Sequence, residues 1–214
     1  MIAFHDTQFI LASASPRRQQ LLRQLGFDPV CMPVDIDEQA FEGETPAALV
    51  TRLACQKAER CLQLGFQKDK PASGNGVVVL GADTVIDLDG EILGKPQCKS
   101  DGLSMLQRLA DREHSVLTGV CVLRADFKSV GSAPEKNQIC IATQLRFGPV
   151  SKAQANAYWQ SGEPVDKAGG YAIQGLGAQF VAYLSGSYSN VVGLPLYETN
   201  HLLTQAGLSA NYPA

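Results

Sequence analysis

A short segment near the N-terminus combines small hydroxyl residues with two arginines. The apolar run Phe9–Ala12 leads into Ser-Ala-Ser-Pro-Arg-Arg at positions 13–18, and leucines at helical spacing follow. The beginning of a helix has backbone N–H groups without partners, which attract anions, and guanidinium groups bind phosphate oxygens in pairs. Ser13, Arg17 and Arg18 are therefore candidates for a phosphate-binding cradle. An ordinary serine cap followed by two solvated arginines is the alternative interpretation.

Asp83 is a second candidate for chemistry, because it directly follows the apolar run Val77–Ala82. Such a run is typical of a buried central strand, and α/β proteins place their sites at the carboxyl ends of these strands. A carboxylate in that position can bind a divalent cation or accept a proton. The alternative is an aspartate that caps a turn together with Thr84.

Glu38, Lys57 and Lys95 are weaker candidates when each is taken alone. Lys57 lies inside the apolar stripe of an expected helix. Lysine is rarely buried without a partner, so a side chain that extends to solvent is the plainer interpretation. Lys95 follows an expected hairpin, and Glu38 lies in an acidic run. Both positions also suit ordinary surface charges.

A glycine-rich segment covers positions 166–175 and contains Gln174. Glycines allow a ligand to approach the backbone closely, although they also occur in twisted, turn-rich connections. The amide of Gln174 has both a donor and an acceptor, so it could bind the edge of a nucleobase.

The elements that must position these residues alternate between strands and helices, which predicts an α/β fold. We expect strands at Phe9–Ala12, Val30–Val34, Val77–Ala82, Val116–Leu123, Ile139–Phe147 and Phe180–Leu184. We expect helices at Pro16–Leu25, Thr45–Leu64, Ser100–Leu109, Ser151–Trp159 and Pro195–Ala206. Asp89–Gly90 predicts a hairpin turn, and the polar stretch Lys128–Asn137 predicts an exposed loop. No linker divides the chain, so residues 1–214 form one domain or two tightly fused lobes.

The composition excludes several classes of protein. Hydrophobic residues make up 45% of the chain and charged residues 18%, which is typical of a globular protein. The net charge of −3 gives no general attraction to nucleic acid or to anionic lipid. The N-terminus has no basic region followed by an apolar stretch, and no run approaches the length of a membrane span. We therefore expect a cytoplasmic protein without a nucleic-acid or membrane partner.

Cysteine and histidine are placed in a way that limits the chemistry further. The six cysteines contain no C-x-x-C pair, and the three histidines lie far apart. Buried, reduced thiols are the better interpretation, and a zinc site or a Ser-His-Asp triad is poorly supported. If the chain is an enzyme, its carboxylates, lysines and arginines must do the chemistry.

Five blocks of sequence occur in order between about Phe9 and Leu203: LASASPRRQQLLRQLGF, RLACQKA, GADTVIDLDGEILGKP, DKAGGYAIQG and SYSNVVGLPL. They resemble the Maf family of nucleoside triphosphate pyrophosphatases. The resemblance implies an elongated α/β fold related to that of the inosine triphosphate pyrophosphatases. In it a mixed sheet is flanked by helices around a central cleft.

The resemblance also implies a reaction and the residues that perform it. A nucleoside triphosphate would be cleaved between its α and β phosphates with the help of a divalent metal. The family's catalytic set falls on Asp83, Glu38, Lys57 and Lys95, and its substrate-binding serine and arginine fall on Ser13 and Arg18. Asp83 and Glu38 would also be the ligands of Mg²⁺ or Mn²⁺, which prefer oxygen donors.

Three positions that sort substrates within the family fall on Arg17, Thr84 and Gln174. They match the branch that acts on dTTP and UTP, whereas the branch that acts on 7-methyl-GTP tends to carry an aromatic residue, Gln and Glu. The resemblance thus predicts a pyrimidine nucleoside triphosphate as substrate. Two alternatives stay open: an enzyme of the 7-methyl-GTP type, and a nucleotide-binding regulator of septum formation without turnover. The oligomeric state is also open, a homodimer included.

Overall fold

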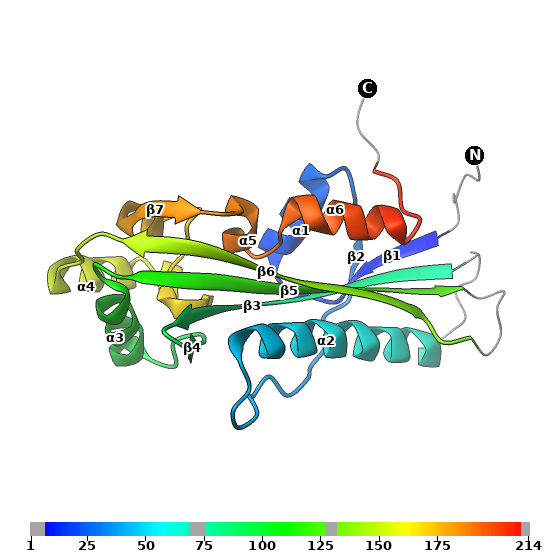
Figure 1. Ribbon diagram of the computed structural model, residues 1–214, viewed down its shortest axis with the longest axis horizontal. Helices are drawn as coiled ribbons and strands as arrows, with labels where there is room; N and C mark the ends of the chain where they lie inside the picture. Colours follow the sequence, from blue (N-terminus) through cyan, green and yellow to red (C-terminus); the bar gives the residue numbers. More distant parts are fainter. Residues whose placement is uncertain (1–6, 69–75, 127–131, 211–214) are drawn as a thin grey trace.

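A mixed sheet of seven strands extends along the molecule, and the helices pack on both of its faces (Figure 1). The computed structural model describes residues 7–68, 76–126 and 132–210. The strand order is β2-β1-β3-β5-β6-β7, and β4 pairs with β3. The strands are β1 (Thr7–Leu11), β2 (Val30–Cys31), β3 (Gly76–Leu88), β4 (Glu91–Leu93), β5 (Glu113–Asp126), β6 (Glu135–Phe147) and β7 (Val181–Ser185).

Helix α2 covers one face of the sheet, and α1, α5 and α6 lie on the opposite face (Figure 1). Helices α3 and α4 lie at the end of the sheet where β4 is found. The helices are α1 (Pro16–Gln24), α2 (Pro46–Lys68), α3 (Lys99–Leu109), α4 (Lys152–Gln160), α5 (Tyr188–Val192) and α6 (Leu196–Gln205). Short 3-10 helices cover Glu163–Asp166, Ala168–Gly170 and Leu176–Phe180. In the part of the chain that the structure describes, no helix is long and apolar enough to cross a membrane.

Apolar side chains fill the space on both sides of the sheet. On the α2 face, Ala54 and Ala58 pack with Val77, Val79 and Cys121. On the opposite face, leucines of α1 and α6 pack on β3 and β5: Leu21, Leu22, Leu202 and Leu203. Each fully buried Val or Leu contributes about 1.5–3 kcal/mol relative to an exposed one, so these two layers hold the helices firmly on the sheet.

The predicted α/β class, with a mixed sheet flanked by helices, is confirmed. Pro16 begins α1, and Gly26 follows its end with a φ of 77°. The hairpin at Asp89–Gly90 is also confirmed, since β3 and β4 pair on either side of it and both residues have positive φ.

Most of the predicted strands differ from the observed ones in their bounds, and β5, for example, covers Glu113–Asp126 instead of Val116–Leu123. β2 covers only Val30–Cys31 instead of Val30–Val34, and β6 begins at Glu135, inside the predicted loop Lys128–Asn137. Residues 127–131, part of that predicted loop, lie outside the described residues.

Asp83 is not at the end of its strand, which corrects the prediction that a strand stops at Ala82. β3 continues through Asp83 to Leu88, because β5 pairs with it as far as Asp87 and β4 pairs with Leu88. Gly119 of β5 lies opposite Asp83. The strand that does end nearby is the parallel neighbour β1, whose last residue, Leu11, lies opposite Leu80. Asp83 therefore lies just past the carboxyl end of β1, where that strand leads into Ser13.

Candidate active site

A cleft of about 700 Å³ opens where β1 ends beside β3. It is lined by every residue that the sequence marked as a candidate: Ser13, Arg17, Arg18, Glu38, Lys57, Asp83, Thr84, Lys95 and Gln174. These residues come from β3, α1, α2 and four connecting segments. The fold thus brings residues that are far apart in the chain into one hollow.

Lys57 lies between two carboxylates in the cleft. Its Nζ atom is 2.6 Å from Oδ1 of Asp83 and 2.6 Å from Oε1 of Glu38. Lys57 and Asp83 are each only 8% exposed, whereas the side chain of Glu38 is about half exposed. The prediction that the side chain of Lys57 extends to solvent was therefore wrong. Lys57 is an enclosed cation with paired carboxylates, and such groups are costly to leave unpaired.

The pKa of Glu38 is determined by the charged groups beside it. Burial alone would raise the pKa of the Glu38 carboxyl, but the hydrogen bond and charge of Lys57 outweigh that effect. The charges of Lys95 and Arg18 act in the same direction, so the pKa of Glu38 is lower than usual. Glu38 is therefore ionised at neutral pH and available as an oxygen ligand.

Two glycines inside the strands allow α2 to lie close enough for Lys57 to reach Asp83. A Cβ atom on Gly81 would lie 2.2 Å from the carbonyl oxygen of Ala54, and one on Gly119 would lie 2.3 Å from that of Val50. Neither distance is sterically allowed, so only glycine fits. Our sequence analysis missed this role. The available signal was a glycine within an apolar strand, which often marks a close approach of another backbone.

Arg18 is the centre of the phosphate cradle predicted from the sequence. Its Nε donates to the carbonyl oxygen of Gly193 at 2.9 Å, and its two terminal nitrogens donate to Oγ of Ser13 at 3.3 Å and Oγ1 of Thr84 at 3.1 Å. Burial lowers the pKa of Arg18, and the charge of Asp83 opposes that effect. Thr84 Oγ1 is also 2.9 Å from Oγ1 of Thr118 in the next strand. The guanidinium group is thus held in one orientation.

The beginning of α1 differs in detail from a simple serine cap. Ser15 occupies the N-cap position, but its side chain makes no capping hydrogen bond. Instead, Oγ of Ser13 accepts the N–H of Ser15 at 3.2 Å. The first turn of α1 therefore opens into the cleft beside Arg17 and Arg18.

Lys95, Arg17 and Gln174 lie farther out in the cleft. Lys95 is exposed and has no ion-pair partner within the ranges described. Arg17 has its nearest carboxylate in Asp166, at 4.0 Å. Lys167 also lines the cleft, and its Nζ donates to the carbonyl oxygen of Glu163 at 2.8 Å. Asp166 and Lys167 begin the glycine-rich segment, and neither was predicted to belong to the site.

The segment that carries Glu38 is attached to α2 by Arg52, another residue that the sequence analysis did not single out. The guanidinium group of Arg52 binds both carboxylate oxygens of Glu44 at 2.7 Å and the carbonyl oxygen of Gln39 at 2.9 Å. It also lies 4.0 Å above the ring of Phe41. Glu38 and Lys57 are thus both anchored to the same helix.

The cleft offers two carboxylate ligands for a divalent cation, Glu38 and Asp83. No cluster of three or more histidine, cysteine, aspartate or glutamate side chains that could hold a metal occurs in the ranges described. Glu38 and Asp83 nevertheless converge on one atom, Nζ of Lys57. Mg²⁺ is commonly bound by one or two carboxylates, together with water and substrate phosphates. Two carboxylates beside a phosphate cradle meet that requirement.

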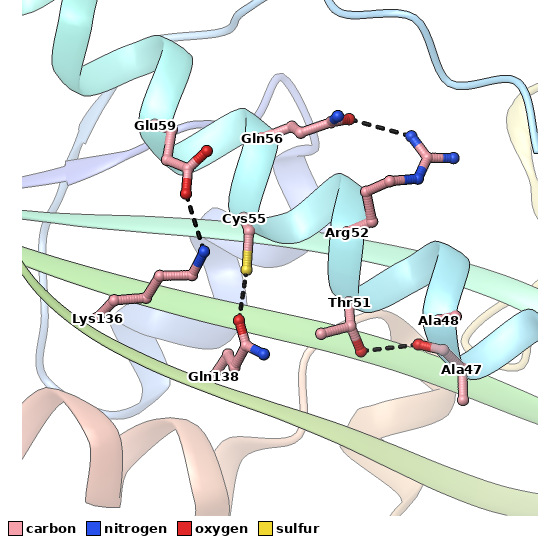
Figure 2. A pocket seen from close by; sticks show the side chains of 9 residues that line it. All are labelled: Ala47, Ala48, Thr51, Arg52, Cys55, Gln56, Glu59, Lys136 and Gln138. Atoms are coloured by element: carbon pink, nitrogen blue, oxygen red, sulfur yellow. Dashed lines mark hydrogen bonds and ion pairs between the residues drawn. The ribbon is translucent and has the colours of Figure 1, made fainter.

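A second hollow is lined by residues of α2 and β6 and contains none of the candidate residues (Figure 2). There the thiol of Cys55 donates to Oε1 of Gln138 at 2.8 Å, and Lys136 pairs with Glu59 at 2.9 Å. Arg52, the remaining charged residue of this hollow, is paired with Glu44. The cleft at Lys57 is therefore the candidate active site.

The fold and the cleft together define an α/β protein with a cleft lined by four cationic side chains of the candidate set: Arg17, Arg18, Lys57 and Lys95. The family model described as Maf-like protein matches residues 8–206, so the chain belongs to the Maf family. It is 47% identical to the dTTP/UTP pyrophosphatase of Symbiobacterium thermophilum over 200 residues, which cover 94% of each chain. It is 46% identical to the protein of the same name from Pseudoalteromonas atlantica, over 94% of this chain and 97% of the relative. The Vibrio vulnificus protein of that name is 44% identical, over 92% of this chain and 97% of its own length.

Proposed function

We propose that this chain is a pyrophosphatase that hydrolyses dTTP and UTP to the nucleoside monophosphate and pyrophosphate. The observation that carries the proposal is the enclosed Lys57–Asp83 pair beside the Arg18 cradle. The names of the relatives, which match this chain over nearly its full length, support the same substrates.

The cations of the cleft bind the triphosphate. A nucleoside triphosphate carries about four negative charges near neutral pH, which positively charged clamps neutralise. Arg18 is already oriented by its protein partners, and Arg17 lies beside it at the beginning of α1. Lys95 is exposed at the cleft and free to move towards the β or γ phosphate. Ser13 adds a hydroxyl group at the same end of the cradle.

Asp83 acts on the attacking water. A water molecule attacks the α-phosphorus, the bond from that phosphorus to the bridging oxygen breaks, and pyrophosphate leaves with the bond electrons. The carboxylate of Asp83 orients this water and accepts its proton. Lys57 fixes the carboxylate for that role, because it binds Oδ1 at 2.6 Å. Mg²⁺ or Mn²⁺ held by Glu38 and Asp83 would supply positive charge beside the phosphate oxygens.

The base is recognised at the outer part of the cleft, where Gln174 is exposed. Its amide can pair with the carbonyl oxygen and the N3–H of thymine or uracil, because it both donates and accepts. Arg17 holds a phosphate or a base oxygen. Thr84 forms part of the floor next to Asp83 and holds Arg18 in place.

The test is pyrophosphate release from a panel of triphosphates, comprising dTTP, UTP, dCTP, dGTP and 7-methyl-GTP, with Mg²⁺ and with Mn²⁺. We expect release from dTTP and UTP at the highest kcat/KM. Asp83→Asn, purified in the same way, is the blank that excludes a contaminating enzyme. A folded wild-type protein that binds dTTP saturably but releases no pyrophosphate would instead be a nucleotide-binding regulator. A preference for 7-methyl-GTP would overturn the pyrimidine assignment.

A further inference from the structure

Glu163 has its carboxylate enclosed by three hydrogen-bond donors. Oε1 accepts the hydroxyl of Tyr158 at 2.7 Å and the N–H of Gly177 at 2.9 Å, and Oε2 accepts the N–H of Leu176 at 2.8 Å. Glu163 begins the short 3-10 helix Glu163–Asp166. The side chain is directed at the backbone of Leu176 and Gly177, which follow the glycine-rich segment 166–175, and it does not line the cleft.

Tyr158 binds the backbone on the other side of Gln174, at Ala172. Its hydroxyl oxygen accepts the N–H of Ala172 at 3.1 Å while its proton goes to Glu163. Tyr158 is 3% exposed, and its ring packs edge-on against Phe180 with centroids 5.2 Å apart. The Glu163–Tyr158 pair therefore holds the backbone two residues before and two residues after Gln174. We call this pair the clamp.

Two glycines make room for the clamp. A Cβ atom on Gly175 would lie 2.1 Å from Oε2 of Glu163, and one on Gly177 would lie 2.6 Å from the hydroxyl oxygen of Tyr158. The glycines of this segment thus serve a close contact between the backbone and two side chains.

The clamp keeps its charge at neutral pH. Burial alone would raise the pKa of Glu163, but the hydrogen bonds from Gly177, Tyr158 and Leu176 outweigh burial and lower it. Burial, followed by the neighbouring Glu163, raises the pKa of Tyr158. Tyr158 therefore remains a donor and Glu163 remains an acceptor.

We propose that Glu163 and Tyr158 are positioning residues that aim Gln174 at the nucleobase and thereby set the base selectivity of the enzyme. This inference rests on the proposed function. Gln174 is exposed, and its side chain has no hydrogen-bond partner among the residues described. Its direction therefore depends on the backbone on both sides, which the clamp holds. Recognition through one amide needs placement within about 0.5 Å, so a loosened backbone loses selectivity before it loses phosphate binding.

The first experiment measures hydrogen–deuterium exchange of the backbone amides at 172–177. Glu163→Gln replaces an acceptor by an amide nitrogen, and Tyr158→Phe keeps the ring but removes the hydroxyl. We expect both variants to speed exchange at 172–177 by about tenfold or more while the sheet stays protected. Controls are Glu113→Gln, an exposed carboxylate at the beginning of β5, and Tyr183→Phe, an exposed tyrosine in β7. Unchanged exchange in both clamp variants overturns the clamp, whatever the turnover.

The second experiment measures kcat/KM for dTTP and dCTP, which differ in the base edge that Gln174 would bind. We expect Glu163→Gln to lower the dTTP/dCTP ratio about tenfold, since an unpaired polar edge costs about that factor. In the Gln174→Ala background, the same substitution should leave the ratio unchanged, because coupled residues are not additive. An equal fall on both substrates, or an undiminished effect in the Gln174→Ala background, overturns the inference. Absence of turnover in the wild type overturns the proposed function instead.

Discussion

Nζ of Lys57, on helix α2, lies 2.6 Å from Oδ1 of Asp83, on strand β3, and both side chains are almost completely enclosed. The attraction between the two charges offsets the desolvation cost of burying each of them. Removing one partner of such a pair typically costs about 3–5 kcal/mol, because the remaining charge is left without compensation. The proposed chemistry and the stability of the cleft therefore depend on the same two residues.

Asp83→Asn separates the charge of this residue from its shape. Lys57 keeps Glu38 as a partner in this variant, so we expect a folded protein. We expect kcat for dTTP to fall about 100-fold or more, as is usual when a general base is removed. Steady-state kinetics and circular dichroism check both expectations. Asp28→Asn, which changes an exposed carboxylate paired with Arg23, is the control and should keep full activity.

The two lysines of the cleft should respond differently to substitution by alanine. Lys57→Ala leaves the enclosed carboxylate of Asp83 beside Glu38 without its lysine partner, so we expect unfolding at lower urea and loss of turnover. Lys95→Ala changes an exposed side chain, so we expect unchanged stability but a higher KM for dTTP. Urea titration and kinetics on the same preparations test this. An unchanged KM in Lys95→Ala would make Lys95 an ordinary surface charge.

Gly81→Ala tests the close approach of α2 to the sheet. The new Cβ would meet the carbonyl oxygen of Ala54 at 2.2 Å and the nitrogen of Ala58 at 2.8 Å. We expect a loss of about 1–3 kcal/mol in the free energy of unfolding. We also expect reduced kcat, because the shift of α2 moves Lys57. Gly65→Ala, in helix α2, is the control, because a Cβ atom on Gly65 would meet nothing within 4 Å. That change should stabilise the protein by about 0.5–1 kcal/mol.

Gln174→Glu tests how the base is chosen. An ionised glutamate only accepts hydrogen bonds, so it cannot donate to the carbonyl oxygen of thymine or uracil. We expect kcat/KM for dTTP and UTP to fall roughly ten- to a hundredfold, and any activity on 7-methyl-GTP to fall far less. The three substrates are compared as ratios to the wild type. If all three fall equally, Gln174 supports the site without contacting the base.

His114 predicts how stability changes between neutral and acidic pH. Burial lowers the pKa of His114 from 6.5 to about 4. Between these values the unfolded chain binds a proton that the folded protein does not, so stability is lost as the pH falls from about 7 towards 4. The full difference corresponds to about 3 kcal/mol. Urea titrations at several pH values should show a flatter dependence for His114→Phe, which keeps the ring contact with Phe147. His201→Gln, which changes an exposed histidine, should keep the wild-type slope.

Local patterns in the sequence predicted most of the succession of helices and strands, but not the short helix α5. Pro16 and Gly26 bound the first helix, and Asp89–Gly90 marks the hairpin, because proline, glycine and aspartate impose their backbone angles within a few residues. The continuation of β3 through Asp83 could not be found in this way. It depends on β5, whose residues pair with Asp83 and Thr84 from a distant part of the chain.

The candidate site, too, was predicted where local motifs indicate it and missed where it depends on tertiary packing. Motif resemblance found nine residues that line the cleft, Lys57 and Glu38 among them, but not Lys167. The enclosure of Lys57 was missed, because it follows from the small distance between α2 and two strand glycines. The clamp was missed for a similar reason, since Glu163 acts on the backbone at 176–177 rather than on the cleft. Such contacts depend on tertiary packing, which spacing along one chain does not encode.

The bond from Arg18 to the carbonyl oxygen of Gly193 joins residues that are 175 positions apart. During synthesis, Arg18 leaves the ribosome long before its acceptor exists. A nascent chain that stops short of Gly193 can pair β1 with β3 but cannot hold its guanidinium group in the orientation that binds phosphate. Contacts between such distant residues form late, because the loop between them must first be closed. Products of translation that end before Gly193 are therefore expected to lack the complete set of contacts that orients Arg18.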